Sequence, residues 1–171
     1  MASANTIFLV GFMGCGKSEI GKDLAKLLHF NFLDLDESVE KKEGMSVTEI
    51  FETKGETAFR EIESNCLRKV KLENNVVSTG GGTPCFKNNM IWMNENGVTV
   101  YLKTEEKLLF DRLKNDTQSR PLLKNLSGIS LMKFIQIKLG EREKFYLQSQ
   151  LTFHPQNERL KQLILRISQL K

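Results

Sequence analysis

The sequence of 171 residues has few of the features that mark secreted, zinc-binding or membrane-spanning proteins. It contains three cysteines, Cys15, Cys66 and Cys85, which form no C-x-x-C pair and predict neither a disulfide framework nor a zinc site. No apolar run approaches the roughly 18 residues of a membrane-spanning helix. The N-terminus also lacks a cationic segment followed by an apolar core and a cleavage site. We therefore expect a cytoplasmic protein that does not enter a membrane.

A strong excess of one charge is also missing. The formal net charge is +4, and the Lys and Arg residues are scattered, with no block of five or more. A scattered excess permits an anionic surface as partner, but a small anionic substrate explains it equally well. We expect no nucleic-acid partner.

Short apolar runs and helical patterns alternate along the chain. Runs rich in β-forming residues occur at 7–10, 30–33, 76–77, 98–102 and 151–153, each separated from the next by a segment with helical periodicity. This alternation predicts an α/β fold with a largely parallel sheet. Without an internal repeat or a linker, residues 1–171 are expected to form one domain.

Two segments depart from this alternation. Residues 36–72 carry helical patterns that are broken near Gly44 and Gly55, so two or three helices are expected to leave the sheet there. Residues 115–127 are polar, contain Pro121 and are long for a connection in a compact domain. We expect the first segment to carry a substrate site and the second to form a mobile lid.

The sequence GFMGCGKS, residues 11–18, follows the first apolar run and precedes an amphipathic helical pattern. Its glycines allow a tight turn with inward N–H groups, Lys17 supplies a charge for the β- and γ-phosphates, and the Ser18 hydroxyl is suited to Mg²⁺. The alternative is a glycine-rich turn that binds nothing, which the flanking strand and helix make much the weaker interpretation. Cys15 is interpreted as a small residue within the loop.

Two aspartates, Asp34 and Asp36, follow the second apolar run. In an extended chain they would point the same way, at the strand end where α/β folds bind ligands. One carboxylate near Mg²⁺ and one near an acceptor hydroxyl would suit phosphoryl transfer. Alternatively, Asp36 caps the next helix and Asp34 is solvated. The preceding phosphate loop favours the functional interpretation.

Three arginines are candidates for anion binding. Arg60 can pair with Glu63 on a helix, Arg120 lies in the expected lid, and Arg142 falls on the apolar helical face that includes Leu139. An arginine avoids an apolar face unless it is paired or binds a ligand. The alternatives are surface decoration for Arg60, a solvated loop charge for Arg120 and a buried ion pair for Arg142.

Three successive glycines, Gly80, Gly81 and Gly82, directly follow the third apolar run. One glycine would indicate a turn, whereas three suggest a group that approaches the backbone closely, with N–H groups available to an anion or a hydroxyl. A flexible turn is the alternative.

Taken in order, the segments GFMGCGKS, LDLD, FREIE, STGGG, RPLL and REKFY resemble the shikimate kinase family over residues 7–153. The resemblance implies a P-loop, nucleoside-monophosphate-kinase-like fold with a central five-stranded parallel sheet flanked by helices. It also implies a monomer that transfers the γ-phosphate of ATP, with Mg²⁺, to the 3-hydroxyl of shikimate in the chorismate pathway of aromatic amino-acid biosynthesis.

For the donor side, the resemblance implies catalytic roles for Lys17 and Arg120, with Arg120 closing on the phosphates. It implies Mg²⁺ contacts by Ser18 directly and by Asp34 through water. The C-terminal segment QSQLTFHPQNERL lacks the adenine-loop signals of the family, so Pro155 and Arg112 are the candidates for contacting the base. The full set expected to bind ATP is Gly14, Cys15, Gly16, Lys17, Ser18, Glu19, Arg112, Arg120 and Pro155.

For the acceptor side, the resemblance implies that Asp36 contacts the reacting hydroxyl and that Arg60 and Arg142 bind the carboxylate. The full set expected to bind shikimate is Asp36, Phe51, Phe59, Arg60, Gly80, Gly81, Gly82 and Arg142. Another small-molecule kinase of this fold, acting on gluconate or a nucleotide, and a non-catalytic nucleotide-binding module are the rival interpretations. The triple glycine and FREIE oppose the first, and intact Asp36, Arg60 and Arg142 oppose the second.

Overall fold

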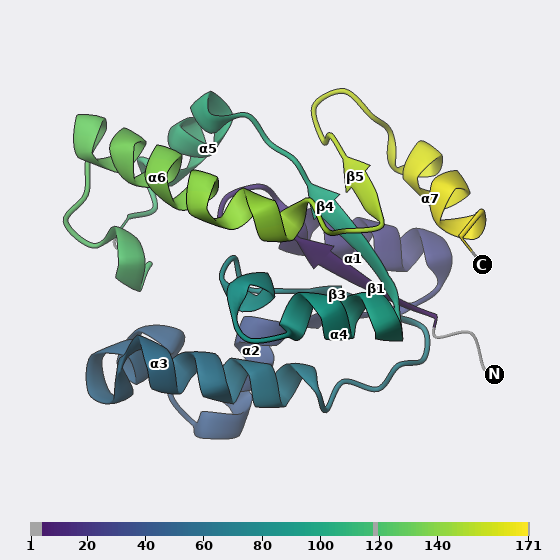
Figure 1. Ribbon diagram of the computed structural model, residues 1–171, viewed down its shortest axis with the longest axis horizontal. Coiled ribbons are helices and arrows are strands. Elements are labelled where there is room, and N and C mark those ends of the chain that lie inside the picture. Colours follow the sequence, from purple (N-terminus) through teal and green to yellow (C-terminus); the bar gives the residue numbers. More distant parts are fainter. Residues whose placement is uncertain (1–4, 118–119, 171) are drawn as a thin grey trace.

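Five parallel strands form one sheet in the order β2-β3-β1-β4-β5 in the computed structural model, which describes residues 5–117 and 120–170 (Figure 1). The predicted parallel α/β sheet is therefore confirmed. The strands are β1 Thr6–Val10, β2 Asn31–Asp34, β3 Asn75–Ser78, β4 Val98–Leu102 and β5 Leu151–Phe153.

Helices cover the sheet and extend beyond it. Every residue of β1, β3 and β4 is buried, as expected for a parallel sheet covered on both faces. The helices are α1 Lys17–Leu28, α2 Leu35–Glu43, α3 Val47–Leu67, α4 Asn89–Asn96, α5 Glu106–Leu113, α6 Gly128–Tyr146 and α7 Leu160–Ser168, with short 3₁₀ turns η1 Thr83–Cys85 and η2 Pro121–Leu123.

The strand order places a crevice at the carboxyl end of β1. After β1 the chain runs to β2 at one edge of the sheet, and after β4 it runs to β5 at the opposite edge. In open α/β sheets, ligands bind where neighbouring connections diverge in this way. Figure 1 shows α2 with α3 on one side of this region and α5 with α6 on the other.

The helical excursion has the predicted form. Gly44 ends α2 in the left-handed conformation (φ 66°), and Gly55 (φ 82°) interrupts the helical geometry within α3. The two sequence breaks therefore mark a helix end and a kink. Ser46 caps the start of α3 through a reciprocal pair of hydrogen bonds with Glu49.

The expected lid, residues 115–127, is described except at positions 118 and 119, which lie outside the described residues. Arg120 is extended (φ −119°, ψ 112°), as its place before Pro121 predicts, and η2 follows directly. Ser127 caps α6 through a reciprocal interaction with Ser130.

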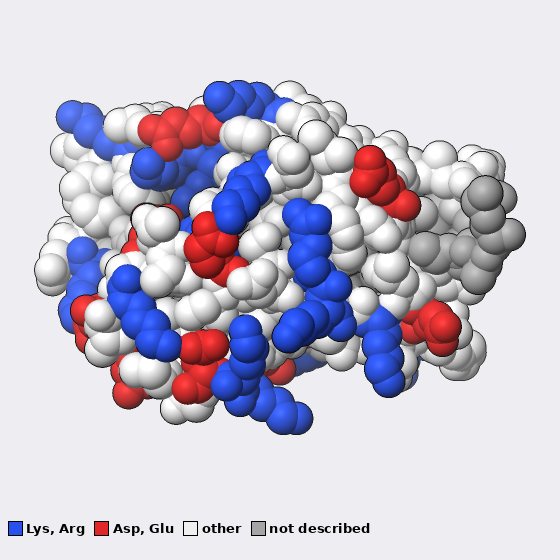
Figure 2. Space-filling model, turned by 60° about the horizontal axis from the view of Figure 1, so that its bottom comes forward, with Lys and Arg blue, Asp and Glu red and all other residues white. Residues whose placement is uncertain are grey.

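Two observations concern the surface charge and the helices. On the face in Figure 2, basic side chains lie among acidic ones and do not form one continuous patch. Within residues 5–117 and 120–170, no helix combines the length and the apolar character needed to cross a bilayer.

Candidate active site

The phosphate loop joins β1 to α1 and is shaped by its glycines. Gly14 and Gly16 have φ values of 80° and 94°, which side chains other than glycine rarely adopt. Gly16 directly precedes α1, so the first N–H groups of that helix face the space above the loop. The loop therefore has the backbone form that binds phosphate.

Lys17 is folded into its own loop. Its Nζ donates hydrogen bonds to the carbonyl oxygens of Gly11 (2.9 Å) and Phe12 (3.0 Å), and it contacts the Cys15 Sγ at 3.6 Å. Cys15 is 1% exposed, in agreement with its interpretation as a small residue within the loop. The Lys17 side chain is almost fully buried, so its charge is held in place at the centre of the loop.

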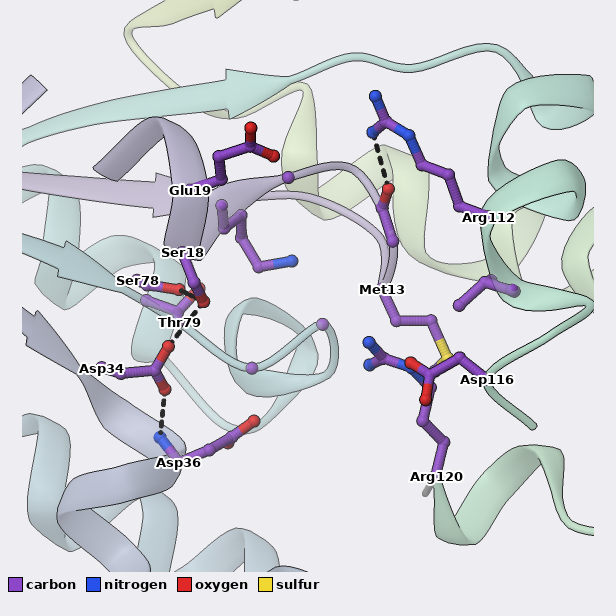
Figure 3. Close-up of a pocket in the computed structure, with 16 residues that line it drawn as sticks. Met13, Ser18, Glu19, Asp34, Asp36, Ser78, Thr79, Arg112, Asp116 and Arg120 are labelled. Carbon is purple, nitrogen blue, oxygen red and sulfur yellow. Dashed lines mark hydrogen bonds and ion pairs between the residues drawn. The ribbon is translucent and has the colours of Figure 1, made fainter. Parts of the chain in front are cut away.

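A cavity of about 360 Å³ lies next to this loop. Figure 3 shows Ser18, Asp34 and Asp36 on one side of it, and Met13, Arg112 and Arg120 across from them. The residues that line it are Met13, Gly14, Gly16, Lys17, Ser18, Glu19, Asp34, Asp36, Ser78, Thr79, Gly80, Gly81, Arg112, Leu113, Asp116 and Arg120.

Ser18 and Asp34 form an oxygen-rich corner of this cavity. The Ser18 hydroxyl donates to Asp34 Oδ2 at 2.7 Å and lies 3.3 Å from the Ser78 hydroxyl. Two hydroxyls and a carboxylate are donors of the type that Mg²⁺ prefers, and Mg²⁺ in phosphate sites keeps several waters. In the described part of the chain, no group of three or more His, Cys, Asp or Glu residues is placed to hold a metal ion.

The two aspartates differ from the sequence-based picture of a shared extended strand. β2 ends at Asp34, and the chain turns into α2 at Leu35, because Asp34 accepts a hydrogen bond from the Asp36 backbone N–H at 3.0 Å. The expectation of a common extended geometry was wrong. The alternative in which Asp36 is the capping residue was wrong too, since Asp34 is the cap.

Asp36 lies in the first turn of α2, where its carboxyl group is largely buried. Burial, helped by the negative charges of Glu63 and Asp34, raises the pKa of Asp36 from 3.8 to about 6; Lys17 and Arg60 oppose the shift. A carboxyl group with this pKa can exchange a proton near neutral pH.

A second cavity, of about 250 Å³, adjoins the first and is enclosed by the excursion, the glycine run and α6. Phe51 and Phe59 form an apolar wall, with ring centroids 4.7 Å apart. The lining residues are Met13, Asp36, Glu40, Val47, Thr48, Phe51, Phe59, Arg60, Glu63, Gly80, Gly81, Gly82, Arg120, Pro121, Leu122 and Arg142.

Arg60 is fixed by a fully buried carboxylate. Its Nη1 donates to Glu63 Oε2 at 2.8 Å, and its Nη2 lies 3.4 Å from Glu56 Oε1. The second oxygen of Glu63 accepts the Thr83 hydroxyl. The helical pair expected for Arg60 and Glu63 is present, and it holds the guanidinium at the cavity wall.

Arg142 lies on the same buried face of α6 as Leu131, Ile135 and Leu139, as the periodicity predicts. It is 8% exposed, and among the described residues its buried Nη1 has no hydrogen-bond partner. The guanidinium also lies over the Phe12 ring, 5.8 Å from its centroid. A buried cationic donor without a partner is costly unless a ligand completes it.

Neighbouring side chains require two of the three glycines, Gly80 and Gly82. A Cβ at Gly80 would collide with Glu63 Oε1, and one at Gly82 would collide with the Arg60 guanidinium. The close approach inferred from the sequence therefore exists, and in this structure the approaching groups are Glu63 and Arg60. The flexible-turn alternative does not account for this packing.

On the far side of the first cavity, Arg112 donates to the Gly14 carbonyl oxygen at 2.9 Å. Arg120 Nε pairs with Asp116 Oδ2 at 2.9 Å, and both residues line the cavity. Arg120 also lines the second cavity, so it stands at the junction of the two.

The two remaining residues expected to contact ATP, Glu19 and Pro155, differ in whether they line a cavity. Glu19 lines the first cavity, whereas Pro155, beyond β5, lines neither of these two cavities. The sequence interpretation did not include Met13, Ser78, Thr79 and Asp116. Ser78 and Thr79 directly precede the glycine run and could have been found there, but nothing local distinguishes Met13 or Asp116.

A parallel sheet with a phosphate loop after β1, an oxygen-rich corner and an adjoining cavity with two buried guanidiniums defines a P-loop small-molecule kinase. A family model described as shikimate kinase matches residues 13–170. A shikimate kinase of Parabacteroides distasonis is 47% identical over 148 residues, which cover 86% of this chain and 86% of that protein.

Solved structures of shikimate kinases also resemble this chain. The crystal structure of shikimate kinase from Bacteroides thetaiotaomicron matches with a TM-score of 0.87 and 41% identity, covering 97% of each chain. The shikimate kinase from Acinetobacter baumannii in complex with shikimate matches with a TM-score of 0.85 and 33% identity, covering 97% of this chain and 92% of that one. This chain belongs to the shikimate kinase family and is an ATP-dependent kinase.

Proposed function

We propose that this protein transfers the γ-phosphate of ATP to the 3-hydroxyl of shikimate, giving shikimate 3-phosphate and ADP. The observation that carries the proposal is the position of Asp36, which lines both the phosphate-loop cavity and the cavity with two buried guanidiniums. A group at this junction can contact a hydroxyl of an acceptor in one cavity while the phosphate donor occupies the other.

The acceptor cavity suits a small polyhydroxylated acid. Arg60 and Arg142 offer guanidinium donors to a carboxylate, and Arg142 has a buried donor that needs a partner. Phe51 and Phe59 can cover an apolar ring face, while Gly80, Gly81 and Gly82 present backbone close to the ring hydroxyls. A nucleoside would need a larger apolar surface, and gluconate has no ring to pack against the aromatic wall.

In the transfer, the acceptor oxygen forms a bond to the γ-phosphorus as the bond to the β,γ-bridging oxygen breaks, and ADP leaves. Asp36 accepts the hydroxyl proton or orients the hydroxyl. Lys17 and Arg120 stabilise the charge on the transferring group. The ATP contacts proposed for Gly14, Cys15, Gly16, Glu19 and Arg112 belong to the phosphate-loop region, and Pro155 is proposed to contact the base from outside the first cavity.

Mg²⁺ is proposed at the oxygen-rich corner, with Ser18 as a direct ligand and Asp34 acting through water. The 2.7 Å hydrogen bond between these side chains brings a hydroxyl and a carboxylate together beside the phosphate loop. When bound, the ion would neutralise phosphate charge and orient the γ-phosphate.

The protein is further proposed to act as a single-domain monomer in the cytoplasm. Residues of this one chain line both cavities, so no partner subunit is needed to complete the site. The three cysteines are free thiols, which fits a reducing compartment. Size-exclusion chromatography with light scattering tests the monomer.

The activity is tested by ADP release at saturating Mg·ATP. We expect release that depends on shikimate, with gluconate and nucleoside monophosphates giving background rates. An equal stimulation by gluconate, or no stimulation by shikimate, would contradict the proposed substrate. Phosphorus NMR of the product then identifies the esterified hydroxyl.

A further inference from the structure

Tyr146, the last residue of α6, is fully buried and contacts the glycine run. Its hydroxyl donates a hydrogen bond to the Gly81 carbonyl oxygen at 2.6 Å, across 65 positions of sequence. Its ring packs against Tyr101, with centroids 5.2 Å apart. A buried phenol usually has a partner for its hydroxyl, and here that partner is backbone of the candidate active site.

Gly81 occupies a junction between the donor and acceptor sites. A Cβ at this glycine would lie 3.3 Å from the Met13 backbone nitrogen in the phosphate loop and 3.5 Å from Arg142 Nη1. Gly81 also lines both cavities. A small rotation of this peptide would therefore disturb the guanidinium on one side and the phosphate loop on the other.

The hydrogen bond fixes the orientation of one peptide plane. In a trans peptide the carbonyl oxygen and the following N–H point in opposite directions, and the structure has no cis peptide among its described residues. Holding the Gly81 carbonyl toward α6 therefore turns the Gly82 N–H away from α6. Gly82 lines the acceptor cavity beside Arg60.

α6 links the two acceptor-binding features. Arg142 and Tyr146 are four residues apart and lie on the same buried face of that helix. Burial raises the pKa of Tyr146 well above its ordinary value, although the positive charge of Arg142 and a hydrogen bond between the two side chains partly offset this. The hydroxyl therefore stays protonated, and remains a donor, throughout the neutral pH range.

We propose that Tyr146 is a positioning residue, which uses its hydroxyl to fix the Gly81–Gly82 peptide against α6 in the orientation that receives the acceptor. The role rests on the proposed function. It concerns acceptor binding, because the peptide that the hydroxyl fixes leads into Gly82, which lines the acceptor cavity and not the phosphate-loop cavity.

The test compares Tyr146→Phe with Tyr101→Phe. Phenylalanine fills nearly the same volume, so each variant loses a hydroxyl while its ring packing remains. Tyr101 is the matched control because it is the buried ring neighbour of Tyr146, and its hydroxyl donates to Glu143 (3.3 Å), outside both cavities. Kinetics and thermal unfolding are measured for both variants and the wild type.

For Tyr146→Phe we expect the KM for shikimate to rise about tenfold, with the KM for ATP within about twofold. The rise corresponds to the loss of about one hydrogen bond, because acceptor binding must then order the freed Gly81–Gly82 peptide. Tyr101→Phe should leave both constants within about twofold. Calorimetric titration with shikimate should show the same selective loss.

Two results would overturn the role. One is an unchanged shikimate KM in Tyr146→Phe. The other is a parallel rise of both KM values together with a lower Tm than that of Tyr101→Phe, which would show that the hydroxyl only stabilises the fold. If instead the wild type and Tyr101→Phe fail to turn over shikimate, the proposed function fails and the role falls with it.

Discussion

The raised pKa of Asp36 predicts that kcat/KM for shikimate falls on the acid side of the pH profile, here called the acid limb. If Asp36 must be ionised to accept the hydroxyl proton, kcat/KM for shikimate should fall as the pH drops through about 6, the pKa that burial, Glu63 and Asp34 produce. An aspartate with its ordinary pKa of 3.8 would keep the rate nearly constant down to pH 5.

The size of the effect follows from the pKa. With a value of about 6, only about a tenth of Asp36 is ionised at pH 5, so kcat/KM should be about tenfold below its plateau. The carboxyl group of the acceptor, with an ordinary pKa of about 4, stays mostly ionised at that pH. The fall in kcat/KM near pH 6 therefore reports the ionisation of a group on the enzyme and not of the acceptor.

The measurement is initial ADP release at saturating Mg·ATP, quenched and quantified directly, from pH 4.5 to 8.5. Asp36→Asn serves as the control, because its residual rate should lack the limb near pH 6. A wild-type profile that stays flat to pH 5, or an identical limb in Asp36→Asn, would refute the reasoning.

The same shift has a consequence for stability. The carboxyl group binds its proton more tightly in the folded chain, so ionisation opposes folding: the cost is absent below pH 3.8 and complete above pH 6. The two values correspond to a cost of about 3 kcal/mol at most. Asp36→Asn should therefore raise the Tm at pH 8 and leave it nearly unchanged at pH 3.5.

Three further predictions concern the binding groups. Arg142→Ala should raise the KM for shikimate between about tenfold and a hundredfold and leave that for ATP within about twofold; calorimetry showing equal losses would contradict carboxylate binding. Ser18→Ala should raise the Mg²⁺ concentration for half-maximal activity about tenfold, and an unchanged Mg²⁺ dependence would remove Ser18 from the metal site. Gly82→Ala should displace the Arg60 guanidinium and raise the shikimate KM severalfold, whereas Gly140→Ala, where a Cβ meets nothing within 4 Å, should not.

Features that depend on neighbouring positions in sequence were predictable. The phosphate loop could be recognised because strand, glycine loop and helix follow one another without interruption, and the inward position of Arg142 followed from helical spacing with Leu139. In each case the local pattern itself determines the geometry.

Features that depend on contacts between distant segments were not predictable in detail. The glycine run suggested a close approach, but only the fold shows that Glu63 and Arg60 approach it. Asp116 gave no local signal, since its position opposite the phosphate loop depends on how α5 packs. The geometry of Asp34 and Asp36 was mistaken because α2 begins at Leu35, whereas the expected extended stretch ran through Asp36.

Asp34 gives the site an unusual dependence on chain length. The same carboxylate accepts the Ser18 hydroxyl through one oxygen and, through the other, the Asp36 N–H that starts α2. The positions of the proposed metal corner and of the proposed proton acceptor therefore both depend on the Asp34 carboxylate. An insertion or deletion between Asp34 and Asp36 would shift both at once, so this junction should not tolerate a change in length.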